Sequence, residues 1–516
     1  MAPNRRLRIQ FERCAAALSL ALVAACGGGG GTKPPDDSGG DGSGGTGGGG
    51  GTGGGGDAGG GGGDVGGGGG VAPTVDPPVV VGQFRFWSVA QGLVGEVSDV
   101  SADEAGNVYV AAGEAVYAKT RAAQEFERFD ADDAGLTKNC HDAAGIATPA
   151  PADPAVMCPV ISVAGATPNR AMIGFRGVGT DGDTDADWAV DSGGADVVTF
   201  DGTTLARERH VRVATPPGYV CEFFVPGTSD GQCYGWDPFM VGGRRKMRQV
   251  QRIVVNHDAS RPRSYGDALL GGTHASIAIL VANPEARGWQ DVTGGDPAWA
   301  DARNVFEHEH PAIYAHDRFL TGEAWALAFD PTSNVPWYAN QFRMASLPGY
   351  ASMARPSVTE LHGLWWGNQE PPLPHLWIWE EDADPVDASK RDGVQSIAFC
   401  DDGTMWVGSE SHGLAFRGKG DATFTKVGSP PDGGGVLAVA CDPQDHAVWV
   451  GLAWGGFARY RSGRWIRDVA WDALPAFARG PVRSIQIDRW ASPRIVYMAH
   501  VATKLGPGGV TAYDGP

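Results

Sequence analysis

The sequence is poor in basic residues. Its 516 residues include 41 lysines and arginines against 60 aspartates and glutamates, a net charge of −19. Proteins that bind nucleic acid neutralise backbone phosphates with lysine and arginine, and the one dense basic run, residues 244–248, is too short to provide such a surface. We therefore do not expect nucleic acid as a partner.

Long hydrophobic runs are also missing. A transmembrane helix needs about 20 predominantly apolar residues. The apolar segment 14–26 is too short, and no later segment is long enough. No G-x-S-x-G, P-loop or dinucleotide-binding motif occurs in a fitting structural context. The membrane is therefore expected to be reached only through a lipid, and no common catalytic motif suggests an enzyme.

The N-terminus has the pattern of an export signal. A basic segment, 1–13, precedes the short apolar stretch, as in a signal peptide. The stretch ends LVAAC at residues 22–26, which resembles a bacterial lipobox. This resemblance implies a lipoprotein signal peptide at 1–25, a lipidated Cys26 and, because Gly27 follows, sorting to the bacterial outer membrane. The alternative is an ordinary cleavage site that ends in cysteine.

A glycine-rich segment follows the lipobox. Residues 27–70 hold 29 of the 79 glycines and have no apolar periodicity, so we predict that 26–75 is a disordered linker. A glycine-rich coil of this length spans roughly 35–40 Å on average. It would hold a folded body away from the lipid, facing either the periplasm or the cell surface.

The rest of the chain, 76–516, contains an internal repeat. Each copy consists of an apolar strand, an Asp/Gly turn, a second strand with an aromatic residue, a turn with Gly or Ala, and a third strand. The clear copies surround Tyr109, Trp406, Trp449 and Tyr497. The last three aromatic residues are 43 and 48 positions apart, and a four-stranded propeller blade has about 40–50 residues.

The middle of the chain is more divergent. Candidate second strands there are Asp187–Val190, Ala268–Gly271 and Val335–Tyr338, which brings the number of units to seven. The strand-like segment Phe84–Val89 can supply the outer strand that the last unit lacks. We predict an all-β fold, a seven-bladed β-propeller closed by an N-terminal strand, with six or eight blades as alternatives.

The repeat pattern V-x-S-I-x-x-D-x-G-x-x-W-V-G resembles the two-component-regulator propeller repeat. That family occurs in periplasmic sensor regions of bacterial hybrid histidine kinases and in free secreted propellers. Residues 394–416 match it well, 97–117 and 436–460 fairly, and 482–505 weakly. Units two to four depart from the pattern. The resemblance therefore implies the fold, and we do not carry over a signalling role.

Six cysteines remain if Cys14 is cleaved off and Cys26 is lipidated, and an exported protein can oxidise them. We predict two disulfides between cysteines close in sequence, each worth about 3 kcal/mol by loop closure: Cys140–Cys158 and Cys221–Cys233. Cys400 and Cys441 end the inner strands of neighbouring units. Equivalent positions on adjacent blades are expected to exceed the ~7 Å Cα limit of a disulfide, so we predict two buried thiols.

Several histidines belong to second-to-third-strand turns or to a link between units, which lie on one face of a propeller. We expect these residues to gather on one rim of the channel: His274, His308, His310, His316, His362 and His412. Such a cluster could bind Zn²⁺ or another divalent ion, or act in general acid–base catalysis. The alternative is that they are turn residues, because histidine tolerates unusual φ and their spacing matches no helical metal motif.

Two other patterns have both a functional and a structural interpretation. The segment Asp181–Asp187 alternates carboxylates as Ca²⁺ loops do, but it lacks the glycine and glutamate of an EF-hand, so a solvated turn is the simpler interpretation. A group of tryptophans in unit four could stack against a sugar or aromatic ligand, or pack between blades: Trp365, Trp366, Trp377 and Trp379.

The pattern as a whole favours a binding protein. We expect a monomeric lipoprotein whose propeller binds a ligand or protein partner, an envelope protein or a glycan, at the channel face. Propellers host many unrelated activities, so this function is an analogy at the level of the fold. The alternatives are a metal-assisted lyase or hydrolase at the histidine-rich rim, and a structural envelope protein.

Overall fold

The computed structural model divides into two compact units, Met1–Thr74 and Val75–Pro516. All residues that it describes belong to the second unit: 75–140, 153–177, 193–211, 249–272, 277–282, 325–339, 344–346, 394–410, 412–421, 423–428, 430, 434–504 and 506–515. The predicted signal peptide, Cys26 and the glycine-rich linker lie outside these residues. None of the described helices has the length and apolar content needed to cross a membrane.

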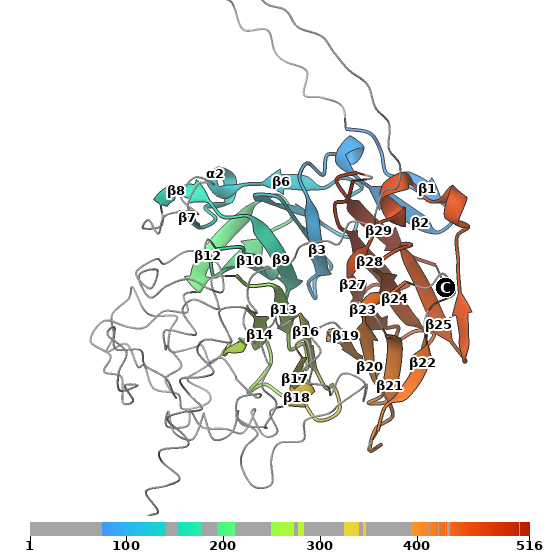
Figure 1. The fold of residues 1–516 in the computed structure, drawn as a ribbon. Coiled ribbons are helices and arrows are strands. Elements are labelled where there is room, and N and C mark those ends of the chain that lie inside the picture. The colour runs from blue at the N-terminus through green and yellow to red at the C-terminus, as the bar shows by residue number, and fades with distance from the viewer. Residues whose placement is uncertain are drawn as a thin grey trace, which may run out of the picture. The chain divides into compact units, whose positions relative to one another are not determined.

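The described elements are almost all antiparallel strands (Figure 1). The first half of the unit forms three sheets in chain order: β3 (Val97–Ala102), β4 (Val108–Ala112), β5 (Ala115–Lys119) and β6 (Glu127–Phe129); β9 (Val160–Gly165), β10 (Arg170–Phe175), β11 (Ala195–Phe200) and β12 (Leu205–Val211); β13 (Arg252–Val255), β14 (Ala268–Gly271) and β15 (Ile277–Leu280). A separate pair is β7 (Lys138–Cys140) and β8 (Asp153–Met157).

The second half repeats this order. Its sheets are β16 (Ala326–Phe329), β17 (Pro336–Ala339) and β18 (Met344–Ser346); β19 (Val394–Phe399), β20 (Met405–Ser409), β21 (Gly413–Arg417) and β22 (Thr425–Gly428); β23 (Val436–Cys441), β24 (Val448–Leu452), β25 (Phe457–Arg461) and β26 (Arg464–Ile466). The helices are short: η1 (Val89–Gln91), α2 (Ala131–Ala134), η10 (Trp471–Ala473) and η11 (Ala476–Arg479).

One sheet joins both ends of the unit. It contains β27 (Val482–Asp488), β28 (Ile495–His500) and β29 (Gly509–Tyr513), followed by β2 (Phe84–Trp87) and β1 (Val79–Val81). Strand β2 pairs with β29, with Phe84 opposite Tyr513. The N-terminal segment thus supplies the outer strands of the C-terminal sheet, as expected from its sequence.

The first strand of each large sheet contacts the first strand of the next. The contacts run from β3 through β9, β13, β16, β19 and β23 to β27, and β27 contacts β3. In Figure 1 these strands surround one common region. Inner strands that face a shared centre, with later strands further out, are the arrangement of a β-propeller.

The hydrophobic core lies between neighbouring sheets. One cluster joins Tyr109 and Val116 of the β3 sheet to Val163 and Phe200 of the β9 sheet, and others join the β19 and β23 sheets and the β27 and β3 sheets. Successive side chains of a strand point to opposite faces of its sheet, so one face can pack against the preceding sheet and the other against the next. The β3, β9, β19, β23 and β27 sheets thus have core clusters on both faces.

In two of the repeats the Asp and the aromatic residue contact each other. The hydroxyl of Tyr109 donates to Asp103 at 2.9 Å, and the indole N–H of Trp449 donates to Asp442 at 3.0 Å. Asp103 also accepts the backbone N–H of Asn107, which closes the turn between the first two strands. These contacts explain why the two residue types recur at this spacing.

The second repeat of the propeller differs from its prediction. Its second strand is β10, Arg170–Phe175, so the assignment to Asp187–Val190, which lies outside the described residues, is wrong. The turn before β10 has no glycine; Asn169 adopts φ 63° instead, and asparagine tolerates this conformation. The sequence prediction missed this strand because the turn lacks a glycine and the strand lacks a Trp-Val or Tyr-Val pair. The second strands predicted at 268–271 and 335–338 correspond to β14 and β17.

Candidate functional site

Most predicted site residues lie outside the described part of the chain, and the structure does not place them. They are Cys26, the calcium-loop candidate Asp181–Asp187, Cys221, Cys233, His274, His308, His310, His316, His362, Trp365, Trp366, Trp377 and Trp379. His412 is described. It lies in the turn between β20 and β21, and its backbone N–H donates to the Ser409 hydroxyl at 3.0 Å. Among the described residues, no group of three or more metal-ligating side chains is found.

The described cysteines form two disulfides. Cys140–Cys158, with a Cα–Cα distance of 5.1 Å, is the predicted bridge. Cys400 and Cys441 are also bridged, at 5.2 Å, so the prediction of two free thiols is wrong. The prediction placed both cysteines on inner strands but took the spacing of neighbouring blades as too wide, whereas the first strands β19 and β23 contact each other directly. Blades converge toward the centre of a propeller, which brings the ends of inner strands within bonding range.

His500 ends β28 and is buried. Its imidazole packs edge-on to the rings of Phe457 and Phe477, and Nε2 lies 2.8 Å from the Thr511 hydroxyl. Burial lowers the pKa of His500 to about 3. This histidine therefore belongs to the core and does not contribute to a rim cluster.

The buried His500 predicts acid sensitivity. The unfolded chain takes up a proton at this residue near pH 6.5 and the folded chain only near pH 3. The free energy of unfolding is therefore unaffected by this group above pH 6.5 and decreases as the pH falls below it. We expect wild type to lose about 2–3 kcal/mol more than His500→Gln between pH 7 and pH 4.5, measured by urea denaturation. His446→Asn is the matched control, because His446 is exposed at φ 58°. Equal pH profiles for wild type and His500→Gln would contradict this.

Two cavities lie at opposite ends of the inner strands. The first, of about 340 Å³, is lined by residues near the starts of β3, β9, β13, β16, β19, β23 and β27. The second, of about 570 Å³, is lined by residues near the ends of six of these strands, all except β9. We call them the entry cavity and the exit cavity, after the direction of the inner strands. The entry cavity is on the side of the second-to-third-strand turns, the face where we expected a site.

The side chains around the entry cavity follow a rule in the sequence. In the inner-strand pattern V-x-S-I, the position x lines this cavity in each repeat. These residues are Ser98, Ile161, Gln251, Trp325, Gln395, Leu437 and Arg483. A β-bulge contributes to the rule: in β3, β19, β23 and β27 the register with the second strand skips position x, so this residue is left out of the regular pairing. The sequence analysis above does not predict these residues, although their common position in the repeat is visible in the sequence.

Arg252 lies between the two cavities and lines both of them. Its Nη1 is 3.3 Å from Asp99 Oδ1 on β3 and donates to the Ser484 hydroxyl on β27 at 3.1 Å. Asp99 also accepts the backbone N–H groups of Val100 and Val163, at 2.9 and 3.1 Å. Four sheets are linked in this way. Arg252 lies at the boundary of the two cavities together with Leu327, Ile397 and Val439, which also line both.

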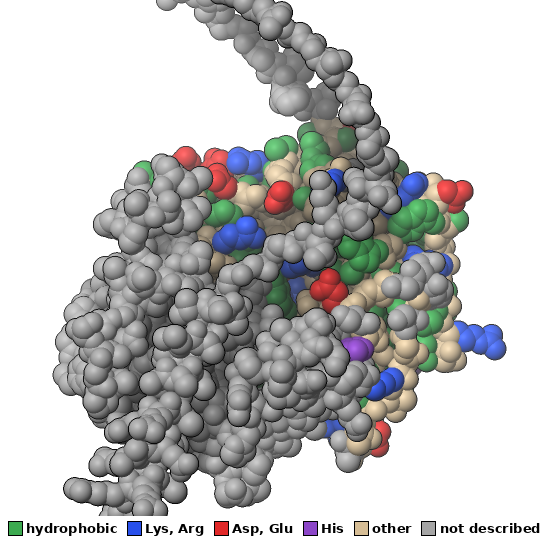
Figure 2. Space-filling view, in the orientation of Figure 1, with side chains coloured by type: hydrophobic (Ala, Val, Ile, Leu, Met, Phe, Trp, Pro, Cys, Tyr) green, Lys and Arg blue, Asp and Glu red, His purple; other side chains and the backbone are tan. Residues whose placement is uncertain are grey.

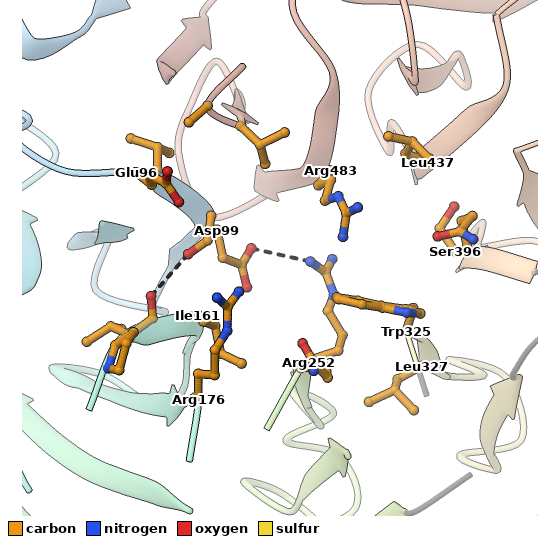
Figure 3. A pocket seen from close by; sticks show the side chains of 18 of the residues that line it. Glu96, Asp99, Ile161, Arg176, Arg252, Trp325, Leu327, Ser396, Leu437 and Arg483 are labelled. Atoms are coloured by element: carbon orange, nitrogen blue, oxygen red, sulfur yellow. Dashed lines mark hydrogen bonds and ion pairs between the residues drawn. The ribbon is translucent and has the colours of Figure 1, made fainter. Parts of the chain in front are cut away.

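Two further guanidinium groups line the entry cavity. Arg483 lies 5.1 Å from the ring of Trp325, a cation–π distance. Arg176 enters from the end of the β9 sheet's second strand. Figure 3 shows Arg252 and Arg483 directed toward the same space, with Arg176 beside Asp99. The cavity therefore presents positive charge in a chain whose net charge is strongly negative.

Exposed tryptophans lie on the same side of the sheets. Trp454, in the turn between β24 and β25, is 72% exposed, and Trp471 of η10 is 45% exposed. The Trp454 carbonyl lies close to Gly434, just before the inner strand β23, and the Trp471 ring lies close to Gly455. On the face shown in Figure 2, hydrophobic and Lys or Arg side chains are interspersed over the C-terminal sheets. Tryptophan and arginine are the residues most enriched in binding hot spots.

A different cluster lies beside the exit cavity, which His257 and Trp490 line. His257 Nδ1 lies 2.9 Å from Glu104 Oε1, and the Tyr265 hydroxyl donates to Glu104 Oε2 at 2.6 Å. Burial opposes ionisation of Glu104, but these hydrogen bonds outweigh it and lower its pKa. The ring of His257 packs edge-on against Trp490 at 5.0 Å. The contacts of this cluster connect the turns of three sheets to one another.

No family model matches this chain, and no curated protein sequence matches it. Solved structures that resemble it include the extracellular domain of BT3049, a hybrid two-component system of B. thetaiotaomicron (TM-score 0.45, 13% identity, 84% of this chain and 42% of that one), and PorZ, a surface component of the type-IX secretion system of Porphyromonas gingivalis (0.42, 11%, 80% and 46%). YCF48 bound to D1 peptide is another (0.44, 12%, 85% and 99%). The chain spans less than half the length of the first two, and we transfer no ligand or partner from them.

Proposed function

We propose that this chain is an outer-membrane lipoprotein whose seven-bladed, closed β-propeller binds a ligand or protein partner at the entry cavity. Seven blades are supported by the succession of contacts between first strands, and closure by the contact of β27 with β3 and the pairing of β2 with β29. The lipobox-like sequence supports the anchor, at Cys26.

One observation carries the binding role. The entry cavity brings three arginines and a tryptophan to the centre of the face where second-to-third turns meet, next to the exposed Trp454. Concave sites with a few convergent polar groups are the usual ligand sites of proteins. The function that this geometry supports best is therefore recognition, with the propeller as a rigid scaffold.

Binding at this face is tested by site-specific cross-linking in intact cells. A photoreactive amino acid at Trp454 is expected to cross-link a partner, whereas the same group at Val80, which is 63% exposed on β1, is not. The two positions are comparably accessible, so the comparison separates a specific surface from random collision. Equal cross-linking from both, or none from Trp454, would argue against a protein partner at this face.

The anchor is tested by Cys26→Ser. Two or more acyl chains hold a protein stably on a membrane, so the variant is expected to move from the membrane fraction to the soluble fraction and to lose metabolic labelling with palmitate. Cys14→Ser is the matched control, because Cys14 lies in the apolar stretch before the predicted cleavage site. Retention of label and membrane association in Cys26→Ser would refute lipidation at this residue.

A further inference from the structure

The entry cavity contains positive charge that the described residues do not balance. Within the described part of the chain, Arg176 and Arg483 form no ion pair, whereas Arg252 pairs with Asp99. Asp99 is already used by Arg252 and two backbone N–H groups. Glu96 is the other carboxylate that lines the cavity, which leaves two guanidinium groups against one carboxylate.

This arrangement favours an anion. Guanidinium groups that share a cavity repel one another, and the repulsion is relieved when a negative group enters. Arginine is the side chain best suited to a carboxylate, because its planar N–H groups make paired, charge-assisted hydrogen bonds. The contact with Trp325 restricts Arg483, so less conformational entropy is lost when it binds.

The size of the cavity limits the ligand. Its volume of about 340 Å³ is at the lower end of the range of about 300–1,000 Å³ for small-molecule sites. At the end toward the exit cavity, the Arg252 side chain extends to Asp99 and Ser484 and limits the depth of the entry cavity. A single monomer or a chain end fits such a space, and a folded domain does not.

We propose that the entry cavity binds the carboxylate group of a monomer-sized ligand, a sugar acid or an amino acid, with Arg176 and Arg483 as the charge-assisted donors. This inference rests on the proposed function and names the ligand class of that same site. The negative charge of Glu96 lowers the affinity of the site for anions, and Arg252 limits its depth.

The test is calorimetric titration of the full chain in detergent at fixed salt. The probes are D-glucuronate and N-acetylglycine, each compared with its neutral amide, D-glucuronamide and N-acetylglycinamide. At least one carboxylate is expected to bind about tenfold or more tightly than its amide. The carboxylate that binds identifies the source as a sugar acid or an amino acid, and binding of both assigns recognition to the carboxylate itself.

The variants locate the site. Arg176→Ala and Arg483→Ala are each expected to weaken binding about tenfold or more, Arg483→Lys to weaken it less, and Glu96→Gln to strengthen it. Arg489→Ala is the control. Arg489 lines the exit cavity, and its substitution removes the same charge, so the affinity is expected to stay unchanged. Thermal melting of each variant separates a binding defect from unfolding.

Two results would overturn this inference: no carboxylate binds more tightly than its amide, or Arg489→Ala weakens binding as much as the entry-cavity variants. The second result would indicate bulk electrostatic attraction. Cross-linking from Trp454 distinguishes these failures from failure of the proposed function. A cross-linked partner without carboxylate binding would leave recognition at this face intact and reject only the ligand class.

Discussion

Phe86→Ala should lower the free energy of unfolding by about 3–5 kcal/mol, the usual cost of removing a fully buried phenylalanine. The Phe86 side chain is completely buried, lies within 6.3 Å of Phe84 and 6.2 Å of Phe477, and belongs to the strand that pairs with β29. The loss includes the contacts of the ring and weaker pairing at the edge of β29, which β2 covers. Urea denaturation of the full chain measures it.

The neighbouring strand provides the control for Phe86. Val80 on β1 is 63% exposed, so Val80→Ala should change stability by no more than about 0.5 kcal/mol. Comparing the stabilities of the two variants tests whether the N-terminal segment is part of the C-terminal sheet or only lies near it. A Phe86→Ala protein as stable as Val80→Ala would contradict the pairing of β2 with β29.

Arg494→Ala should also cost about 3–5 kcal/mol at pH 7, because it leaves a buried carboxylate without its counter-charge. Asp442 is fully buried, and its Oδ2 lies 2.6 Å from Arg494 Nε and 3.0 Å from the Trp449 indole nitrogen. Burial opposes ionisation of Asp442, but the hydrogen bonds from Arg494 and Trp449 outweigh it and lower its pKa. The pair joins the β23 sheet to the β27 sheet.

The pH dependence and a double variant test this ion pair. The lowered pKa of Asp442 adds stability above the ordinary carboxyl pKa of 3.8, and this contribution is lost as the pH falls through the folded-state value. Without Arg494 the carboxylate takes up a proton more readily, so the cost of Arg494→Ala should shrink in acid. The double variant Asp442→Asn, Arg494→Met should be more stable than Arg494→Ala, because no unpaired charge is buried.

A surface ion pair provides the comparison. Arg128 and Asp130 lie 2.7 Å apart with side chains 48% and 32% exposed, and such pairs contribute at most about 1 kcal/mol. Arg128→Ala should therefore have a small effect. If Arg494→Ala were equally mild, the contact between the β23 and β27 sheets would not depend on this pair.

The repeating part of the fold was predictable because its determinants are local. The alternation of apolar residues, the Asp/Gly turn and the aromatic residue of the second strand lie within about 20 residues of one another, and Asp442 with Trp449 shows that they interact within one hairpin. Where that chemistry changed, prediction failed: Asn169 replaced the glycine of the turn, and the second strand of that unit was misplaced.

The candidate site was predictable only in part. Strand order alone places second-to-third turns and inter-unit links at the same end of the sheets, which is the end where the entry cavity lies; that this face binds a ligand stays a prediction. The lining residues at position x of the inner strands were not predicted, because their residue types differ from one repeat to the next and form no motif. The predicted tryptophans, and the predicted histidines other than His412, lie outside the described residues. Arg483 and Trp325 occupy that position in two repeats.

The sequence by itself determined the acidic charge, the export-signal pattern, the all-β repeat and the role of Phe84–Trp87 as an additional strand, since each depends on composition or on near neighbours. Only the tertiary structure decided which residues meet at the centre. Arg252 reaches Asp99 across 153 positions and Ser484 across 232, and Cys400 reaches Cys441 in the next sheet. Such contacts depend on how close the inner strands come when the sheets pack, a distance that no local pattern encodes.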